Sequence, residues 1–399
     1  MFMKATLQSL TKMPVLLFSL IFGLIGTLPI QAQTFTVLHS FTGGRDGGNP
    51  LAGFVMDAAG QNIYGTTSSG GSHEAGIVFR LNIHGETILH NFTGGADGGT
   101  PESSLITDPA GNLYGTTYSG GTYGYGVVYE ITPNGEIVLY SFTGGNDGGN
   151  PEARLARDAA GHLYGTTMTG GNLSSGTVFE ITGKNKETVL YNFGAANDGA
   201  QPVAGVTLDA AGNVYGTASQ GGAYGYGMVF ELSPSQSGWT ETILHNFALQ
   251  SDGGTPYGGL TFDKSGNLFG TNTDGGTGAG GGGGTIFELT PSNGGWTFNT
   301  IYGLDGWGVS GTFRDIMVDA SDNIFATTHC DGVNNAGTVY ELVNSGNGTW
   351  TYNQLYLFTG GKDGLYSFSN LVADKAGNLY GTTNQGGNNG DGVIFRVKP

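Results

Sequence analysis

The side chains best suited to bind or transform a ligand are a mixed set of acids, bases, amides and aromatic rings. The polar members are Glu102, Glu152, Arg154, Arg314, Asp315 and Asn370. The aromatic members are Tyr257, Tyr118, Tyr123 and Tyr224, with Tyr125 and Tyr226 beside them. Planar polar groups flanked by aromatic rings suit a sugar or a peptide. No two of the acids belong to a known motif, so no catalytic residue is predicted, and ordinary solvated surface residues remain the alternative interpretation.

These residues can be compared because the sequence repeats. The word NLYGTT at 112–117 recurs in seven versions, and its aromatic residue lies 50 to 56 positions from the next one. The seven aromatic residues are Tyr64, Tyr114, Tyr164, Tyr215, Phe269, Phe325 and Tyr380. A period of this length indicates a repeat architecture. Positions that all repeats share are most simply scaffold, so the polar candidates and Tyr257 are taken from four to six residues before a shared aspartate, where the repeats differ.

One repeat contains four short segments with strand character, at 104–107, 113–117, 126–131 and 136–142. They are rich in β-branched and aromatic residues and are separated by Gly, Pro, Asn and Asp turns, including the hairpin signal Asn-Gly at 134–135. No segment has the 3.6-residue spacing of a helix. Four antiparallel strands repeated seven times predict an all-β fold, a seven-bladed β-propeller of four-stranded blades. A parallel β-solenoid is the structural alternative.

The two ends of the repeat region complement each other. The last repeat stops after its third strand, whereas a lone strand of the fourth type is present at 35–41. We expect strand 35–41 to complete the last blade and close the ring without leaving a free edge. This predicts a single propeller domain at 33–399, and we expect a monomer.

The first 32 residues have the pattern of an export signal. Lys4 and Lys12 precede or flank an apolar run at 15–26, which is too short to span a bilayer, and Ala32 offers a small residue for cleavage. We therefore expect a signal peptide at 1–32, no membrane span after its removal, and a secreted protein, extracellular or periplasmic. A retained anchor is the alternative. With a net charge of −17 and only 14 Lys and Arg, nucleic acid is not an expected partner.

The whole repeat resembles a known bacterial one. The run from Leu105 through DPAGNLYGTT at 108–117, the Ser-Gly-Gly at 119–121, GVVYEI at 126–131 and LYSFTGGNDG at 139–148 is similar to the GloVer (Gloeo/Verruco) tandem repeat. The resemblance covers essentially all of 34–399. It implies a secreted bacterial repeat protein with propeller-like units. It implies no activity and no catalytic residues.

Two series of aspartates recur in the repeats. The first precedes a turn and comprises Asp57, Asp108, Asp158, Asp209, Asp263, Asp319 and Asp374. The second lies in Gly-rich loops and comprises Asp46, Asp97, Asp147, Asp198, Asp252, Asp305 and Asp363. We expect both to cap turns, with weak calcium binding as the alternative; no other cofactor or metal is predicted. His39, His90 and His245 occupy a position that holds Tyr in other repeats, which favours packing or hydrogen bonding over metal ligation. We expect 329–331 (HCD) to be a divergent loop.

Strand alternation places the Gly-rich loops on one face of the ring and the plain turns on the other. We predict a secreted, non-enzymatic binding scaffold for a glycan, peptide or surface partner, which uses the loop-rich face. The alternative is an enzyme that uses the propeller channel, such as a metal-dependent lactonase or a polysaccharide lyase or hydrolase. The acids available for it are Glu102, Glu152 and Asp315.

Overall fold

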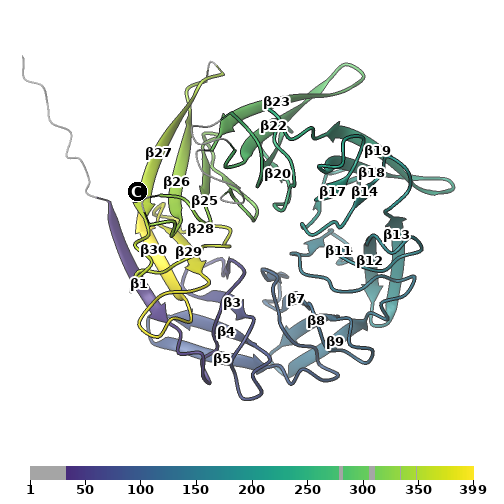
Figure 1. The fold of residues 1–399 in the computed structure, drawn as a ribbon. Helices are drawn as coiled ribbons and strands as arrows, with labels where there is room; N and C mark the ends of the chain where they lie inside the picture. The colour runs from purple at the N-terminus through teal and green to yellow at the C-terminus, as the bar shows by residue number, and fades with distance from the viewer. Residues whose placement is uncertain (1–32, 278–281, 305–310, 333, 347) are drawn as a thin grey trace, which may run out of the picture. The chain divides into compact units, whose positions relative to one another are not determined.

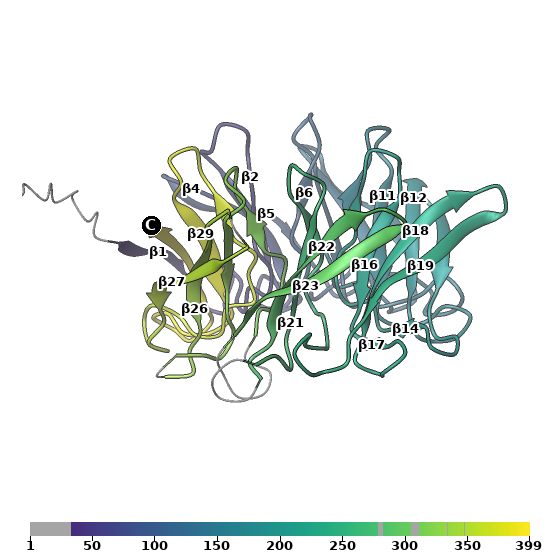
Figure 2. The same cartoon turned by 90° about the horizontal axis from the view of Figure 1, so that it is seen from above.

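The computed structural model describes residues 33–277, 282–304, 311–332, 334–346 and 348–399. These residues form seven four-stranded antiparallel sheets, the blades, arranged around a ring (Figures 1 and 2). We name the strands of each blade A to D from the axis outwards. The propeller prediction is therefore confirmed. Asp305 and residues 1–32 lie outside the described part of the chain, so the predictions made for them are not addressed by the structure.

The strands are short near the axis and longer at the rim. The A strands of blades 1 to 7 are β2 (Val55–Met56), β6 (Ile106–Thr107), β10 (Ala156–Arg157), β15 (Thr207–Leu208), β20 (Thr261–Phe262), β24 (Met317–Val318) and β28 (Val372–Ala373). The B strands are β3 (Ile63–Thr67), β7 (Leu113–Thr117), β11 (Leu163–Thr167), β16 (Val214–Ala218), β21 (Leu268–Asn272), β25 (Ile324–Thr327) and β29 (Leu379–Thr383).

The outer pairs of strands follow the same order. The C strands are β4 (Ile77–Asn82), β8 (Val127–Thr132), β12 (Thr177–Gly183), β18 (Met228–Ser235), β22 (Thr285–Ser292), β26 (Thr338–Asn344) and β30 (Val393–Lys398). The D strands are β5 (Gly85–Asn91), β9 (Gly135–Ser141), β13 (Lys186–Asn192), β19 (Gly238–Asn246), β23 (Gly295–Gly303), β27 (Trp350–Leu357) and, in blade 7, β1 (Thr34–Ser40). A small ribbon of β14 (Gly199–Ala200) and β17 (Gln220–Gly221) joins two loops.

Blade 7 is built from both ends of the described chain. Its strand order is β1-β30-β29-β28, and β1 pairs with β30 from Thr34 opposite Lys398 to Ser40 opposite Val393. The interface between blades 7 and 1, which we call the joint, is therefore crossed by the chain directly after β1. Pairing of β1 leaves β30 with partners on both sides, so its backbone groups are not exposed as a free edge.

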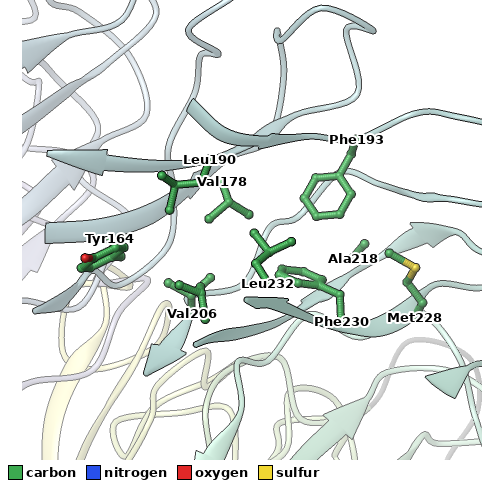
Figure 3. Packing of buried hydrophobic residues seen from close by; sticks show 10 residues of the cluster. Tyr164, Val178, Leu190, Phe193, Val206, Ala218, Met228, Phe230 and Leu232 are labelled. Carbon is green, nitrogen blue, oxygen red and sulfur yellow. The ribbon is translucent and has the colours of Figure 1, made fainter. Parts of the chain in front are cut away.

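The hydrophobic core is divided into clusters that lie between neighbouring blades. Figure 3 shows the cluster between blades 3 and 4, where Phe193 of blade 3 packs on Phe230 of blade 4 with ring centroids 5.1 Å apart. An equivalent buried phenylalanine follows the D strand at most interfaces, for example Phe41 and Phe142. Full burial of each such ring contributes roughly 1.5–3 kcal/mol. Each blade is thus held mainly by its neighbours.

The recurring word NLYGTT is the B strand of each blade. Its first apolar residue packs against the preceding blade, as Leu113 does, and its aromatic residue packs toward the following blade, as Tyr114 does. The residue after the aromatic one must be glycine, because a Cβ on Gly65 would lie 2.8 Å from a ring carbon of Phe54 and from a ring carbon of Phe79. The repeated word is therefore a packing element.

The loops that connect consecutive blades and the B–C loops lie on the same face of the ring, as predicted. In the described residues, the loop before a blade bridges to the B–C loop of that blade, for example Gly48 to Ser69 and Gly99 to Ser119. On the other face, hairpins β18–β19, β22–β23 and β26–β27 extend beyond the ring in Figure 1. Trp296 of β23 packs edge-on against Tyr215 of blade 4, so this hairpin leans on its neighbour.

Candidate functional site

Residues that directly precede the A strands come together across the ring axis and form a plug. On one side, the Ser104 hydroxyl of blade 2 donates to Asn370 Oδ1 of blade 7 at 2.7 Å. The same hydroxyl accepts the backbone N–H of Gly53 of blade 1 at 3.1 Å. Blades 1, 2 and 7 therefore meet through one buried hydroxyl.

An ion pair forms the other side of the plug. Arg154 Nε of blade 3 lies 3.1 Å from Asp315 Oδ2 of blade 6, and Asp315 Oδ1 accepts the Gly259 N–H at 2.8 Å. A Cβ on Gly259 would lie 2.7 Å from Asp315 Oδ1 and 2.9 Å from the Gly205 carbonyl oxygen, so this position requires glycine. The cavity left among the plug residues is about 10 Å³, room for roughly one water molecule. The polar side chains of Arg154, Asp315 and Asn370, which were predicted to bind a ligand, thus form hydrogen bonds within the plug.

Glu102, Glu152 and Arg314 lie together at the mouth of the ring on the loop-rich face. Arg314 Nη2 of blade 6 donates to the Glu102 carbonyl oxygen of blade 2 at 3.4 Å, and its Nε is buried without a hydrogen-bond partner. Burial raises the pKa of Glu152 to about 7, with Arg314 opposing the shift and Glu102 adding to it. Burial also raises the pKa of Glu102, against the effect of Arg314. At neutral pH the Glu152 carboxyl is therefore partly protonated.

Two of the predicted tyrosines belong to the same group. Burial raises the pKa of Tyr118, and the charges of Glu152 and Glu102 raise it further. The pKa of Tyr257 is raised by burial and then by Glu152 and Asp274. Both hydroxyls are therefore within electrostatic reach of Glu152. We call Glu102, Glu152, Arg314, Tyr118 and Tyr257 the axial cluster.

Aromatic rings extend the axial cluster across blades 5 to 7. Tyr257 lies 5.5 Å from Phe313, and Phe313 lies 5.2 Å from Phe368, measured between ring centroids. His329 packs on Phe368 at 4.1 Å, and burial lowers its pKa to about 4, so its ring is neutral. The predicted set of ligand-binding residues did not include Phe313, Phe368 or His329. Phe313 and Phe368 occupy the repeat position of Glu102 and Glu152, which is the signal that could have identified them.

Tyr123 and Tyr224 lie elsewhere on the loop-rich face. They project from the B–C loops of blades 2 and 4 with 58% and 63% of their surface exposed. Leu173 occupies the equivalent loop of blade 3 and is also exposed. No described contact joins these side chains to the axial cluster. They form a separate apolar arc over blades 2 to 4, so the predicted ligand-binding set divides into the plug, the axial cluster and this arc.

The recurrent aspartates act within their own turns. Asp108 Oδ1 accepts the backbone N–H groups of Ala110 and Asn112, both at 2.9 Å. Asp97, in the second series, accepts the Thr93 N–H at 2.9 Å and also the Thr93 hydroxyl. Turn capping is thus confirmed for these residues.

Hydrogen bonds explain why His and Tyr alternate at one position of the D strand. His90 Nε2 lies 3.3 Å from Asp97 Oδ2, and the Tyr140 hydroxyl donates to Asp147 Oδ2 at 3.0 Å. Both side chains can therefore present a donor to the loop aspartate. The predicted preference for hydrogen bonding is confirmed for His90 and also for His245, which lies 3.1 Å from Asp252.

Comparison with known proteins identifies the family. The model of the Gloeobacter/Verrucomicrobia repeat matches residues 21–210, 119–318 and 205–399. The chain belongs to this repeat family. A comparison with curated protein sequences found no relative. The members of the family are defined by the repeat, so membership accounts for the scaffold and leaves the axial cluster to be interpreted from its own residues.

Solved structures share the fold at low sequence identity. PorZ, a surface component of the type-IX secretion system of Porphyromonas gingivalis, has a TM-score of 0.53 and 14% identity, with 86% of this chain covered. This chain spans 46% of PorZ. A candidate 6-phosphogluconolactonase from Bacteroides uniformis has a TM-score of 0.51 and 14% identity, covering 80% of this chain and 88% of that one. The part of our chain that is described contains no helix able to cross a membrane.

Proposed function

We propose that this protein is exported and binds an oligosaccharide at the axial cluster. The observation that carries this proposal is the convergence of Glu102 and Glu152 around Arg314, beside the rings of Tyr257 and Phe313. Export is supported by the apolar run at 15–26 and its flanking lysines.

The two sides of the mouth suit the two kinds of surface on a sugar ring. The carboxyls of Glu102 and Glu152 can accept hydrogen bonds from hydroxyl groups, and the guanidinium of Arg314 beside them can donate hydrogen bonds. Tyr257, Phe313 and the aromatic residues next to them offer apolar surface for the C–H face of a pyranose. A neutral sugar or an amino sugar fits this charge pattern. A uronate is disfavoured, because its carboxylate would meet two partly buried carboxyls.

The plug beneath the axial cluster supports a binding function. Arg154 and Asp315 bond across the axis, and the cavity among the plug residues is about 10 Å³. The cluster therefore has a floor that is held by cross-ring bonds. Preorganisation of this kind lowers the entropic cost of binding.

The proposal is tested by a glycan array with the purified protein, followed by titration calorimetry with the best glycan. We expect Glu152→Gln and Phe313→Ala each to weaken binding about tenfold, which corresponds to about 1.4 kcal/mol. Tyr123→Ala is the matched control, since Tyr123 lies on the separate arc, and its affinity should equal that of the wild type. Absence of glycan binding, or loss of affinity only in Tyr123→Ala, would contradict the proposal.

A second candidate function, cleavage of a saccharide by hydrolysis or by elimination, is favoured by one observation. Glu152 has a pKa of about 7 and lies near a second acid, Glu102, as general acid–base catalysis requires. The assay is release of reducing ends from the glycan that binds. Turnover in the wild type that is lost in Glu152→Gln, with binding retained, would assign the enzyme; a stable wild-type complex would assign binding alone.

A further inference from the structure

The joint between blades 7 and 1 contains three side chains that resemble a metal-binding set. His39 comes from β1, Asp46 from the following loop, and Glu86 from β5 of blade 1. One nitrogen or oxygen atom of each lies within 4.8 Å of the others. Among the described residues, this is the one group of three or more His, Cys, Asp or Glu side chains with such a separation. It lies at the rim, on the outermost strands β1 and β5 and the loop after β1.

Two side-chain atoms of this set are buried and have no hydrogen-bond partner. They are His39 Nε2 and Glu86 Oε1. His39 Nε2 lies 3.5 Å from Asp46 Oδ2, which is an ion-pair distance. Burial, followed by the charge of Asp46, raises the pKa of Glu86 to about 8. Buried groups of this kind normally find a partner, because an unpaired one is costly.

The equivalent positions of other interfaces satisfy the D-strand side chain without a metal. His90 lies 3.3 Å from Asp97, and the Tyr140 hydroxyl donates to Asp147 at 3.0 Å. At the next interface the Tyr191 hydroxyl donates to Glu241 Oε2 at 2.8 Å. The joint keeps the same side-chain types, with His39 Nε2 3.5 Å from Asp46 Oδ2. An unpartnered oxygen is also found in Glu136, Glu187 and Glu241, which are equivalent to Glu86. The joint differs in that one nitrogen or oxygen atom from each of its His, Asp and Glu side chains lies within 4.8 Å of the others.

A cleft lies beside the joint. Its volume is about 670 Å³, and it is lined by Leu38, His39, Met56, Ile83, Tyr380 and Arg396, among others. Ile83 is 93% exposed, so the cleft opens to solvent beside the C–D hairpin of blade 1. His39 lines this cleft, whereas Asp46 and Glu86 do not.

We propose that His39, Asp46 and Glu86 bind one zinc-type divalent cation that links blade 7 to blade 1. One imidazole and two carboxylates suit zinc better than calcium, which prefers oxygen ligands alone. Small side-chain rotations bring the three atoms from within 4.8 Å of one another to ordinary zinc distances. The ion would satisfy both unpartnered atoms and neutralise the adjacent carboxylates. Because its ligands come from both sides of the joint, its binding would stabilise the closed ring.

The test is calorimetric titration and thermal unfolding of tag-free, metal-free protein with zinc chloride. We expect one equivalent to bind and the melting temperature to rise by about 3 °C or more. His39→Tyr should remove this response. It introduces the residue that other repeats hold at this position, so the fold is expected to tolerate it. His90→Tyr is the matched control at the next interface and should keep the zinc response.

Each outcome of this experiment bears on the proposal. A response lost in His39→Tyr and in Glu86→Gln but kept in His90→Tyr supports the site. No response in the wild type overturns it. An equal response in His39→Tyr shows an adventitious ion only, bound by exposed histidines such as His73 or His84, and also overturns it. If His39→Tyr is unfolded by circular dichroism, Glu86→Gln carries the comparison.

Discussion

The ring has an acidic half and an aromatic half, although all seven blades share one backbone plan. At the position where a D strand faces the preceding blade, blades 1 to 4 carry Glu86, Glu136, Glu187 and Glu241. Blades 5 to 7 carry an aromatic ring there: Phe298, Tyr352 and Phe35. The mouth is divided in a similar way, with Glu102 and Glu152 in blades 2 and 3 and Tyr257, Phe313 and Phe368 in blades 5 to 7.

The comparison shows that this D-strand position between neighbouring blades accepts either an acidic or an aromatic side chain. In the aromatic half, Phe298 stacks on His245 at 3.7 Å and Phe35 stacks on Tyr356 at 3.8 Å. In the acidic half, each glutamate keeps a buried, unpartnered oxygen, as in Glu136 and Glu187. The acidic interfaces therefore carry an electrostatic cost that the aromatic interfaces avoid. The buried phenylalanines that follow the D strands pack between blades in both halves, as Phe142 and Phe247 do.

The largest effect is expected where the two halves are joined. Asp315→Ala removes the partner of Arg154 in blade 3 and the acceptor of the Gly259 N–H. We expect the free energy of unfolding to fall by about 3 kcal/mol, because two polar groups lose their partner. Urea unfolding followed by fluorescence measures the change. Glu102→Gln, also at the axis but outside the plug, is the control and should change stability little; equal stability of Asp315→Ala and the wild type would show that the plug is dispensable.

Exchanging the acidic and aromatic residues should change the free energy of unfolding in opposite directions. Phe298→Glu places an acid beside Asp252 and removes the stack on His245, so we expect a loss of about 2 kcal/mol. Glu136→Phe removes an unpartnered carboxylate beside Asp97 and permits a stack on His90, so we expect a gain of about 1 kcal/mol. Thermal unfolding of both variants checks the signs. Destabilisation by both would mean that each position is specific for its own residue.

The acidic half should also make stability depend on pH. Burial and then Asp147 raise the pKa of Glu187 to about 7, above its ordinary value of 4.5. The folded protein therefore binds this proton more tightly than the unfolded chain, and stability is lost as pH rises from about 4.5 through 7. Glu187→Gln should be about 1 kcal/mol more stable than the wild type at about pH 8, after allowance for partial exposure, and equal at about pH 4. Unfolding curves at both values test this; the same difference at both would exclude ionisation as the cause.

The smallest effect concerns calcium at the loop aspartates, which are alike in both halves. Asp97 and Asp363 use both carboxylate oxygens to accept hydrogen bonds from Thr93 and Thr359. We expect about 1 mM calcium to shift the melting temperature of metal-free protein by less than about 1 °C. Differential scanning calorimetry gives the value. A clear rise would restore the calcium interpretation of these loops.

The fold was accessible from the sequence because each repeat carries its own local signals. Hairpin and turn residues such as Asn134-Gly135 and Asp108 fix the strands locally, and seven copies confirm one another. The axial cluster was accessible in part, since Glu102 and Glu152 deviate from the other repeats. The plug was not foreseen, because the bond between Arg154 and Asp315 depends on the close approach of blades 3 and 6, which are 161 residues apart. Likewise, the arc that carries Tyr123 cannot be separated from the axial cluster without coordinates.

The central claim is that the mouth binds a sugar between its acidic and aromatic sides. A crystal structure of the protein with the glycan that binds best on the array tests it most directly. The account predicts a pyranose at the axis, with hydroxyls bonded to Glu152 or Glu102 and one face on Phe313 or Tyr257. A glycan bound only at the arc of Tyr123, Leu173 and Tyr224, with the axial cluster unchanged, would contradict it.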